Sequence, residues 1–440
     1  MLARKMYNQL LQWKRNKQNE TLLIKGARQV GKTFIVRKFG EENYKSFIEI
    51  NFLKFPVLEN IFDGDLTPEE IKKRITAHLP GSTFPTGETL LFLDEIQRCA
   101  RARTALKFLA EDNSIDVIAS GSLLGLHYGQ DSDKEVEAAL SIPVGYERQL
   151  IMYSLDFEEF LWACGYDNGT IDYLKSFFIN REKVPNDINL RFEGLLREFI
   201  VVGGMPAVVS RFIETKDFYE VQREQEKILA AYDDDISNHA STVDKPKIRA
   251  CYESLPNQLA RENKKFKYSE VASGGSARKF SDSLMWLRDS NLVNVCYNVY
   301  EPYLPLKANS INDEFKLYMN DTGLLMAQYG FETKNAVLMG TLRGNAKGGV
   351  YENLISELLI KNGYRLNYYK TAGSTMELEF IIEKGGEVVP IEVKAGNSST
   401  ASLNSFMDKF RPSVAYKLID GNVGIAEGKV TLPHYMVMFI

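Results

Sequence analysis

The 440-residue sequence is poor in cysteine and histidine, with four of each, and this scarcity excludes several classes of protein. The cysteines form no CxxC pair and no histidine cluster lies near them, so neither a zinc ribbon nor a disulfide framework is expected. The histidines lie far apart, and we assign none of them a catalytic role. Reduced, partly buried thiols are expected at Cys99, Cys164, Cys251 and Cys296.

The sequence also lacks a long apolar run and an excess of positive charge. Its most apolar run, from Phe199 to Val209, is interrupted by two glycines and a proline and is shorter than the roughly 18 residues that span a bilayer. The first residues contain no apolar signal-peptide core, so we expect a cytoplasmic protein without membrane contact. With 54 basic and 58 acidic residues the net charge is −4, so nucleic acid would have to contact a local basic patch.

The first 125 residues alternate short apolar runs with helical patterns, which is typical of a parallel sheet covered by helices on both faces. The helix expected at 67–79 begins with Thr67, Pro68 and Glu70, which suit an N-cap, a first turn and a capping box. The fold class is therefore α/β, in a chain long enough for about two to four domains. The expected strands are 21–25, 46–51, 89–94 and 116–120, with further helices at 32–39 and 103–111.

A phosphate-binding loop is the strongest signal in the sequence. Gly26, Gly31, Lys32 and Thr33 fit the GxxxxGKT pattern, between an apolar strand and a helix, as the mechanism of such a loop requires. Backbone amides would surround the phosphates of ATP, Lys32 would reach the β and γ phosphates, and Thr33 would ligate Mg²⁺. The predicted nucleotide-binding residues are Gly26, Ala27, Arg28, Gln29, Val30, Gly31, Lys32, Thr33 and Phe34.

Polar side chains end the last two of the expected strands. Asp94 and Glu95 follow an apolar run; Asp94 is suited to hold Mg²⁺ and Glu95 to orient the attacking water. Ser120 and Ser122 follow the neighbouring run, and either is a candidate for sensing the γ-phosphate, although a simple turn fits them about as well. The predicted catalytic residues are therefore Lys32 and Glu95, with Ser120 as a further candidate.

The rest of the chain divides into three regions. We place the domain boundaries at 1–155, 156–240, 241–335 and 336–440. The second is mainly helical, and the third has helical patterns followed by a hairpin of 292–300 and 315–320, an order typical of a winged helix. Aromatic residues interleave with a basic group in this third region, which favours either a DNA-facing patch or a solvated helix face: Lys264, Lys265, Lys267, Arg278 and Lys279.

A second hairpin is expected near the end of the chain, with Gly385 and Gly386 as its two-residue turn. This register places Glu379 opposite Glu392 and Glu377 opposite Lys394, and strand alternation brings all four charges onto one face. Two directly opposed carboxylates repel by roughly 0.2 to 1 kcal/mol unless a cation intervenes. Lys394 or a bound metal ion would relieve this repulsion.

These motifs resemble those of the prokaryotic AAA-type ATPases that carry an uncharacterised C-terminal domain. The resemblance covers nearly the whole chain. It implies an ATPase of the type in which one strand separates the phosphate-loop strand from the Asp-Glu strand, followed by a winged-helix-like region and a nuclease-like fold. The resemblance rests on the segments at 26–33, 90–98, 119–125, 155–161, 203–209, 320–325 and 391–395.

The terminal hairpin itself resembles the core of PD-(D/E)xK nucleases, an α/β restriction-endonuclease-like fold. This resemblance implies that Glu379 and Glu392 bind a second Mg²⁺ or Mn²⁺, with Lys394 as the polarising cation and Glu352 as a further ligand. Glu379 stands where the pattern usually has aspartate, and a charged solvent face or a degenerate fold is the alternative.

An arginine that stabilises the transition state is harder to assign. Relatives place a Gly-Arg pair shortly before the 155–161 segment, whereas two residues separate Gly145 from Arg148 here. Arg148 and Arg98 are both candidates, and an exposed surface role fits either of them equally well. A finger donated between subunits would require a homo-oligomer.

Three hypotheses follow from the sequence. In the first, the protein hydrolyses Mg-ATP and couples the nucleotide state to C-terminal regions directed at DNA or at a protein partner. In the second, the ATPase gates a metal-dependent nuclease. In the third, ATP only stabilises a protein-docking scaffold and is not turned over, which the Asp94-Glu95 pair disfavours.

Overall fold

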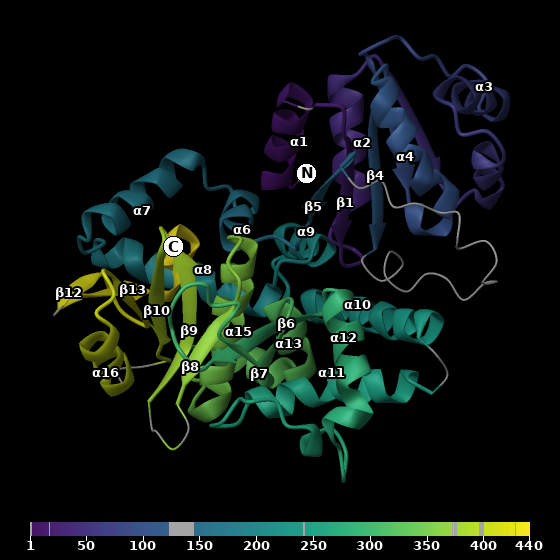
Figure 1. Ribbon diagram of the computed structural model, residues 1–440. Helices are drawn as coiled ribbons and strands as arrows, with labels where there is room; N and C mark the ends of the chain where they lie inside the picture. Colours follow the sequence, from purple (N-terminus) through teal and green to yellow (C-terminus); the bar gives the residue numbers. More distant parts are fainter. Residues whose placement is uncertain are drawn as a thin grey trace. The chain divides into compact units, whose positions relative to one another are not determined.

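The computed structural model describes residues 2–16, 18–122, 145–240, 243–371, 373, 376–395, 400–426 and 428–440, without the side chains of Ser122, Asn238 and His239. Two compact units make up the chain (Figure 1). One consists of residues 3–153, and the other of residues 154–440 together with Leu2. Within the described residues, no helix is both long and apolar enough to cross a bilayer.

The unit of residues 3–153 contains a parallel sheet with the strand order β2-β3-β4-β1-β5 in its described part. Strand β4 separates β1 from β3, which is the order that the family resemblance implies. Because neighbouring strands are parallel, their carboxyl ends meet at one edge of the sheet. The strands are β1 (Thr21–Gly26), β2 (Ser46–Asn51), β3 (Thr89–Asp94), β4 (Asp116–Ser122) and β5 (Glu147–Ile151).

Helices cover both faces of this sheet, as the alternating apolar runs predict. On one face, Leu22, Ile24 and Phe92 pack with apolar residues of α1 (Lys5–Asn16) and α2 (Lys32–Asn43). On the other face, Leu23, Leu91 and Leu93 pack with residues of α3 (Pro68–His78) and α4 (Ala100–Asp112). The short helices η1 (Pro56–Phe62) and η2 (Ile96–Arg98) follow β2 and β3.

Two details differ from the sequence expectation. Strand β5 was not expected, because three of its five residues are polar and it is an edge strand with β1 as its partner in the sheet. Thr67 precedes α3 as its N-cap, but its side chain makes no capping hydrogen bond, so the predicted capping box is wrong. Glu70 instead accepts a hydrogen bond from Arg74, one turn further along the helix.

The unit of residues 154–440 begins with helices, in agreement with the helical pattern of that region. The glycine-rich turn at 203–205 separates α8 from α9. Three of the four cysteines are buried and Cys164 is partly buried; all four are free thiols. The helices are α6 (Phe157–Ala163), α7 (Asn168–Asn180), α8 (Asn186–Val202), α9 (Pro206–Thr215) and α10 (Phe218–His239).

A mixed sheet follows, with the order β12-β13-β11-β10-β9-β8-β6-β7 among the described residues. Its strands are β6 (Val293–Val299), β7 (Ser310–Met319), β8 (Asn367–Lys370), β9 (Glu377–Lys384), β10 (Glu387–Val393), β11 (Ala415–Ile419), β12 (Gly424–Ala426) and β13 (Lys429–Pro433). The remaining helices are α11 (Lys245–Leu259), η4 (Tyr268–Glu270), α12 (Ala277–Asp289), α13 (Thr322–Tyr329), α14 (Phe331–Leu338), α15 (Gly344–Lys361), α16 (Ala401–Phe410) and η5 (His434–Phe439).

The β6–β7 hairpin follows α11 and α12 in the predicted order, but it does not stand apart. Strand β6 pairs in parallel with β8, so strands from both sides of the expected boundary at residues 335 and 336 share one sheet. The terminal hairpin has the predicted register, since Glu387 pairs with Lys384 and Ile391 with Phe380. The winged-helix and nuclease-like assignments of these regions stay predictions.

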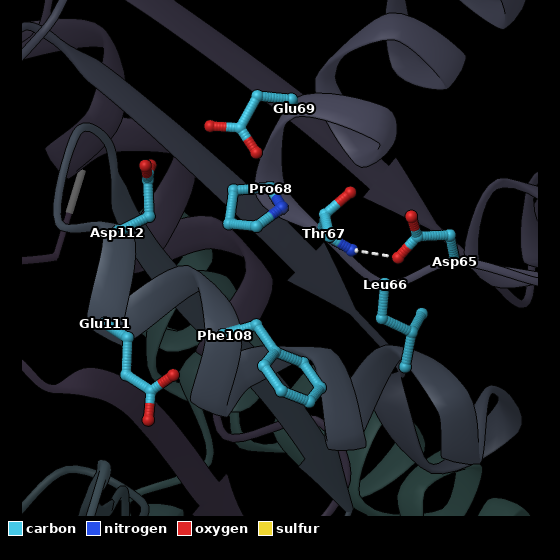
Figure 2. A pocket seen from close by; sticks show the side chains of 8 residues that line it. All are labelled: Asp65, Leu66, Thr67, Pro68, Glu69, Phe108, Glu111 and Asp112. Atoms are coloured by element: carbon cyan, nitrogen blue, oxygen red, sulfur yellow. Dashed lines mark hydrogen bonds between the residues drawn. The ribbon is translucent and has the colours of Figure 1, made fainter.

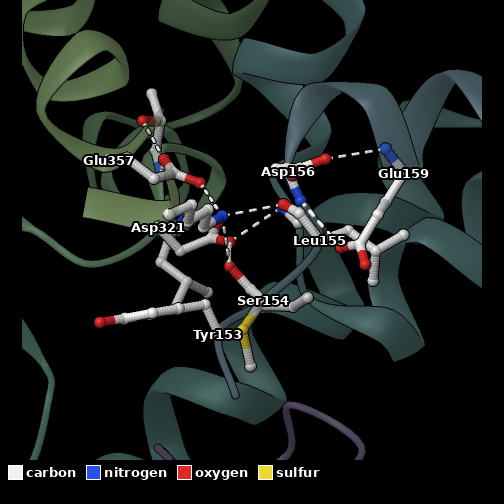
Figure 3. A network of polar contacts seen from close by, with 12 residues as sticks. Tyr153, Ser154, Leu155, Asp156, Glu159, Asp321 and Glu357 are labelled. Atoms are coloured by element: carbon white, nitrogen blue, oxygen red, sulfur yellow. Dashed lines mark hydrogen bonds and ion pairs between the residues drawn. The ribbon is translucent and has the colours of Figure 1, made fainter. Parts of the chain in front are cut away.

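A buried polar network holds the first residues of this unit in place (Figure 3). Ser154 Oγ and the amide of Gly204 both donate to Asp321 Oδ2, at 2.9 and 2.8 Å. Lys361 Nζ donates to Ser154 Oγ at 2.9 Å and also pairs with Glu357. Ser154 is therefore joined to the glycine turn, to the start of α13 and to the end of α15.

Helix α6 begins directly after this network with a complete capping box. Asp156 Oδ1 accepts from the amide of Glu159 at 2.8 Å, and Glu159 Oε2 accepts from the amide of Asp156 at 3.2 Å (Figure 3). This reciprocal pair fixes where the helix begins. The spacing of an aspartate and a glutamate three residues apart was available in the sequence as a signal for it.

Candidate nucleotide-binding site

The GxxxxGKT segment forms a loop between β1 and α2. Strand β1 ends at Gly26, and Gly31 is the N-cap of α2 with φ of 95°, in the left-handed region that favours glycine. A Cβ atom on Gly26 would lie 2.3 Å from the carbonyl oxygen of Met152, so the close approach of these backbones needs glycine there. The loop therefore presents backbone amides at the N-terminus of a 12-residue helix, which suits phosphate groups.

Lys32 lies at the start of α2 with its side chain turned over the loop. Its Nζ donates to the carbonyl oxygens of Gly26 and Ala27, at 3.1 and 2.8 Å. The side chain is buried, and its position keeps the ammonium group beside the loop amides. A positive charge at a loop of backbone amides fits a polyphosphate.

Asp94 is held by donors from three different elements. Its Oδ2 accepts from Thr33 Oγ1 at 2.9 Å and from Asn51 Nδ2 at 2.8 Å, and its Oδ1 accepts from Ser120 Oγ. Asn51 and Ser120 stand directly beside Asp94 in the sheet register, at the ends of β2 and β4. The structure thus brings together Thr33, Asp94 and Ser120, three residues of the predicted site, and adds Asn51.

Sequence reasoning missed Asn51 for an identifiable reason. It is a polar residue at the end of an apolar strand, the same signal that pointed to Asp94 and Ser120, but it is followed by no recognisable motif. Ser120 contacts the carboxylate that is suited to Mg²⁺. The side chain of Ser122, the other serine considered, lies outside the described residues.

Glu95 occupies an unusual backbone conformation directly after β3. Its φ of 57° and ψ of 42° lie in the left-handed region, which costs a non-glycine residue about 1 to 3 kcal/mol and is found most often at functional sites. Its Oε2 accepts a hydrogen bond from Gln97 Nε2 at 2.5 Å. The conformation turns the chain between the end of β3 and η2 and leaves Glu95 next to Asp94, partly buried.

The two arginines considered at the sequence level lie apart from Asp94. Arg148 is on the edge strand β5 opposite Leu22, four residues before the loop, which is about 13 Å along a strand. It forms an ion pair with Glu20 at 3.7 Å, and 47% of its side chain is exposed. Arg98 is exposed in η2, near Glu59. Phe34, the last residue of the predicted nucleotide set, is half-exposed on α2.

Arg4 contacts the loop, although no sequence signal pointed to it. Its two terminal nitrogens donate to the carbonyl oxygens of Val30 at 2.9 Å and of Tyr153 at 2.6 Å. Val30 belongs to the phosphate loop, and Tyr153 is the last residue of this unit. Arg4 precedes α1, whose buried residues Met6 and Leu10 anchor it to the sheet.

A separate hollow of about 320 Å³ in the same unit is acidic (Figure 2). It is lined by four carboxylates, around Phe108 and the start of α3. Lys72 pairs with one of them, Asp112, at 2.9 Å. Such a lining repels phosphate groups, so this hollow is not suited to a nucleotide. The carboxylates are Asp65, Glu69, Glu111 and Asp112.

The second predicted site, in the mixed sheet, is a network of paired charges. Lys394 Nζ lies 3.1 Å from Glu379 Oε1 and 3.4 Å from Glu392 Oε1. Glu352 pairs with Lys264 at 2.9 Å and lies 3.7 Å from Lys316. Glu379, Glu392 and Lys394 thus meet as predicted, but lysines already face every one of the predicted carboxylate ligands.

Burial governs the protonation of this network. Desolvation raises the pKa of Glu379 and of Glu392, against the opposing charge of Lys394. Lys394 is the cation that lies beside the buried Glu392 carboxylate, 3.4 Å from its Oε1. Among the described residues, no group of three or more histidine, cysteine, aspartate or glutamate side chains is arranged to hold a metal ion. A second metal site therefore has no geometric support there.

The basic group of the winged-helix-like region is partly used inside the fold. Lys264 is partly buried and pairs with Glu352 at 2.9 Å, and Lys265 pairs with Glu314 at 3.0 Å. Lys279 Nζ donates to the carbonyl oxygen of Gly274. Lys267 and Arg278 remain exposed, so a DNA-facing patch would rest on fewer charges than the sequence pattern indicates.

Three regions of the chain match known domain families. Residues 18–161 match the AAA domain, residues 193–335 match a domain of unknown function (DUF8612), and residues 347–435 match another domain of unknown function (DUF4143). The chain thus carries an AAA-type P-loop ATPase domain with a five-stranded parallel sheet, followed by two regions that resemble families without a known activity. No curated protein matches the chain.

Several solved structures are similar at low identity. A Walker-type ATPase of Pyrococcus abyssi shares 15% identity over 75% of this chain and 96% of that one, with a TM-score of 0.43. AMPPCP-bound DnaA of Aquifex aeolicus shares 16% identity over 65% of this chain and 86% of its own, with a TM-score of 0.30. These scores are too low to carry a conclusion about function.

Proposed function

We propose that the protein hydrolyses Mg-ATP and couples the state of its nucleotide site to residues 154–440. The observation that supports this most directly is the hydrogen bond from Thr33 to Asp94, because it places the two expected Mg²⁺ ligands together beside the phosphate loop. Bound Mg²⁺ would neutralise charge on the phosphates. The AAA domain match over residues 18–161 supports the same assignment.

Each residue of the site has a distinct task in this proposal. The loop amides and Lys32 would hold the phosphates, and Thr33 and Asp94 would hold the metal ion, with Asn51 and Ser120 orienting the aspartate. Glu95 takes a proton from the attacking water or orients it, since its position next to Asp94 is where such a group is needed. Arg148 could assist only from a neighbouring subunit, in a homo-oligomer.

The test is phosphate release from Mg-ATP by the purified full chain. We expect Lys32→Ala to bind ATP about 10- to 100-fold more weakly, as for the loss of a charged donor. Glu95→Gln should bind ATP normally and hydrolyse it at least about 100-fold more slowly. Glu69→Gln, an exposed glutamate on α3, is the matched control and should behave as wild type. Unchanged turnover in Glu95→Gln would contradict the proposal.

The nature of the coupled partner can be read from the same assay. Titrating duplex and single-stranded DNA at low and moderate salt should stimulate hydrolysis in a salt-sensitive way if the partner is DNA. Indifference to DNA points instead to a protein partner. Tight ATP binding without any hydrolysis in the wild type would favour the scaffold alternative.

A further inference from the structure

We propose that Arg4 is a positioning residue that links the phosphate loop to the peptide leading into residues 154–440. This inference rests on the proposed ATP-binding function. It starts from the two hydrogen bonds of one guanidinium group, to the carbonyl oxygens of Val30 and Tyr153. The planar fork of arginine holds both acceptors in fixed directions, which a flexible ammonium group does not.

The bond to Val30 determines where a loop amide points. A trans peptide unit is planar, with its carbonyl oxygen and the following N–H directed to opposite sides. When Arg4 holds the oxygen of Val30, the N–H of Gly31 is aimed the other way. Gly31 is the N-cap of α2 and one of the amides expected to contact phosphate. A charged donor on the carbonyl also polarises the peptide and strengthens its N–H as a donor.

The bond to Tyr153 fixes a second peptide in the same way. The carbonyl of Tyr153 belongs to the peptide that continues to Ser154, whose hydroxyl is held in the buried network by Asp321 and Lys361. Gly26, at the start of the loop, also packs closely on the backbone of Met152. The amide of Met152 donates to the carbonyl oxygen of Lys25 at 2.7 Å. A reorientation of the Val30–Gly31 peptide would therefore move the guanidinium of Arg4 and change its hydrogen bond to the carbonyl oxygen of Tyr153.

The position of Arg4 is itself well determined. The amide of Tyr7 donates to the carbonyl of Arg4 at 3.1 Å, which starts the first turn of α1. Met6, Leu10 and Trp13 on that helix are buried against the sheet. Helix α1 thus holds the guanidinium in place independently of the loop, so the side chain can act on the loop and on Tyr153 together.

The test uses the full chain with Arg4→Ala, Arg4→Lys and, as a matched control, Arg15→Ala, an exposed arginine at the end of the same helix. We expect Arg4→Ala to raise the Kd for Mg-ATP about tenfold, the loss of roughly one charged hydrogen bond. KM should rise in parallel, with kcat at saturation kept within about threefold, because the loop geometry serves substrate and transition state alike. Arg15→Ala should match the wild type.

A second readout reports on the link itself. In wild type and Arg15→Ala, saturating AMPPCP should change amide hydrogen exchange in residues 153–156; in Arg4→Ala this response should be lost although the nucleotide is bound. Arg4→Lys, which keeps the charge but lacks the planar fork of the guanidinium, should keep the wild-type melting temperature and show a reduced response. If Arg4→Lys equals wild type in both affinity and exchange, the inference is wrong. If the wild type binds no ATP, both the proposed function and this inference are wrong.

Discussion

At the scale of single residues, Glu377 shows how strongly the charges of the mixed sheet depend on one another. Lys316 and Lys370 lie 2.8 and 2.6 Å from its carboxylate. Burial alone raises the pKa of Glu377, but the two lysines outweigh it and bring the pKa down to about 2. Because this pKa lies below the ordinary value of 4.5, the pair stabilises the fold above about pH 4.5 and loses this effect as the pH falls toward 2.

We therefore expect Lys316→Met to destabilise the fold by about 3 kcal/mol at pH 7, since Lys316 is buried and its loss leaves Glu377 and Glu352 short of a counter-charge. The cost should shrink at pH 4, because Glu377 takes up a proton more readily once the charge of Lys316 is gone. Lys370→Met is the control: this lysine is 37% exposed, and its loss should cost under about 1 kcal/mol. Urea denaturation at both pH values measures this, and equal losses for the two variants would refute it.

Residue-level reasoning from the sequence reached furthest where a motif fixes the chemistry. The phosphate-loop pattern and the end of an apolar strand pointed to Thr33 and Asp94 as Mg²⁺ ligands, and the two side chains share a hydrogen bond. Lys264 and Lys316, which face Glu352 and Glu377, could not be predicted, because long stretches of chain separate them from these glutamates. Their positions depend on how β7, α15 and β9 pack, which local patterns do not specify.

At the scale of elements, the glycine turn between α8 and α9 depends on close contact between backbones. A Cβ atom on Gly204 would lie 2.0 Å from the carbonyl oxygen of Leu155, and one on Gly323 would lie 2.4 Å from that of Val202. Neither neighbour is a flexible side-chain end that could move aside. The elements that meet here are the start of α6, the end of α8 and the start of α13.

We expect Gly204→Ala to destabilise residues 154–440 strongly, by about 3 kcal/mol or more, as for a severe steric conflict in a packed core. Gly194→Ala is the matched control, because this glycine lies inside α8 with only the end of Arg197 near its Cβ position. That change should be neutral or should stabilise by about 0.5 to 1 kcal/mol. Thermal melting of both variants is the measurement. A loss in Gly194→Ala as large as in Gly204→Ala would contradict this account.

Element prediction succeeded or failed according to how much local pattern each element carries. The β9–β10 hairpin has the expected register because Gly385 and Gly386 fix its turn. Strand β5 carries little pattern, since its exposed edge position removes the need for apolar residues. Strands β6 and β8 pair although they lie far apart in the sequence, and the residues of neither strand predict this pairing.

At the scale of the whole molecule, the charges at and around the predicted nuclease site are balanced. Its glutamates at 352, 379 and 392, with the neighbouring Glu377, face lysines at 264, 316, 370 and 394. A divalent cation bound there would have to displace a lysine or neutralise its charge. The balance favours a structural role for this network over a metal-dependent one.

We therefore expect the full chain, with Mg²⁺ or Mn²⁺ and with or without ATP, to leave supercoiled plasmid DNA uncut. Glu392→Ala and Lys394→Ala should give the same result while retaining ATP hydrolysis. Gel assays of nicking over several hours provide the measurement. Metal-dependent cleavage that disappears in both variants would instead establish the gated nuclease.

The contacts of Arg4 have a consequence for how such a chain could have arisen. Arg4 and Tyr153 are the second and the last residues of the ATPase unit, and one side chain joins them. A segment whose two ends lie together can be cut out of a gene, or spliced into another, with little disturbance to what flanks it. The ATPase unit thus has the form of a transferable segment. A gene fragment that encodes residues 3–153 would include both Arg4 and Tyr153, and so the hydrogen bond that joins the two ends of the unit.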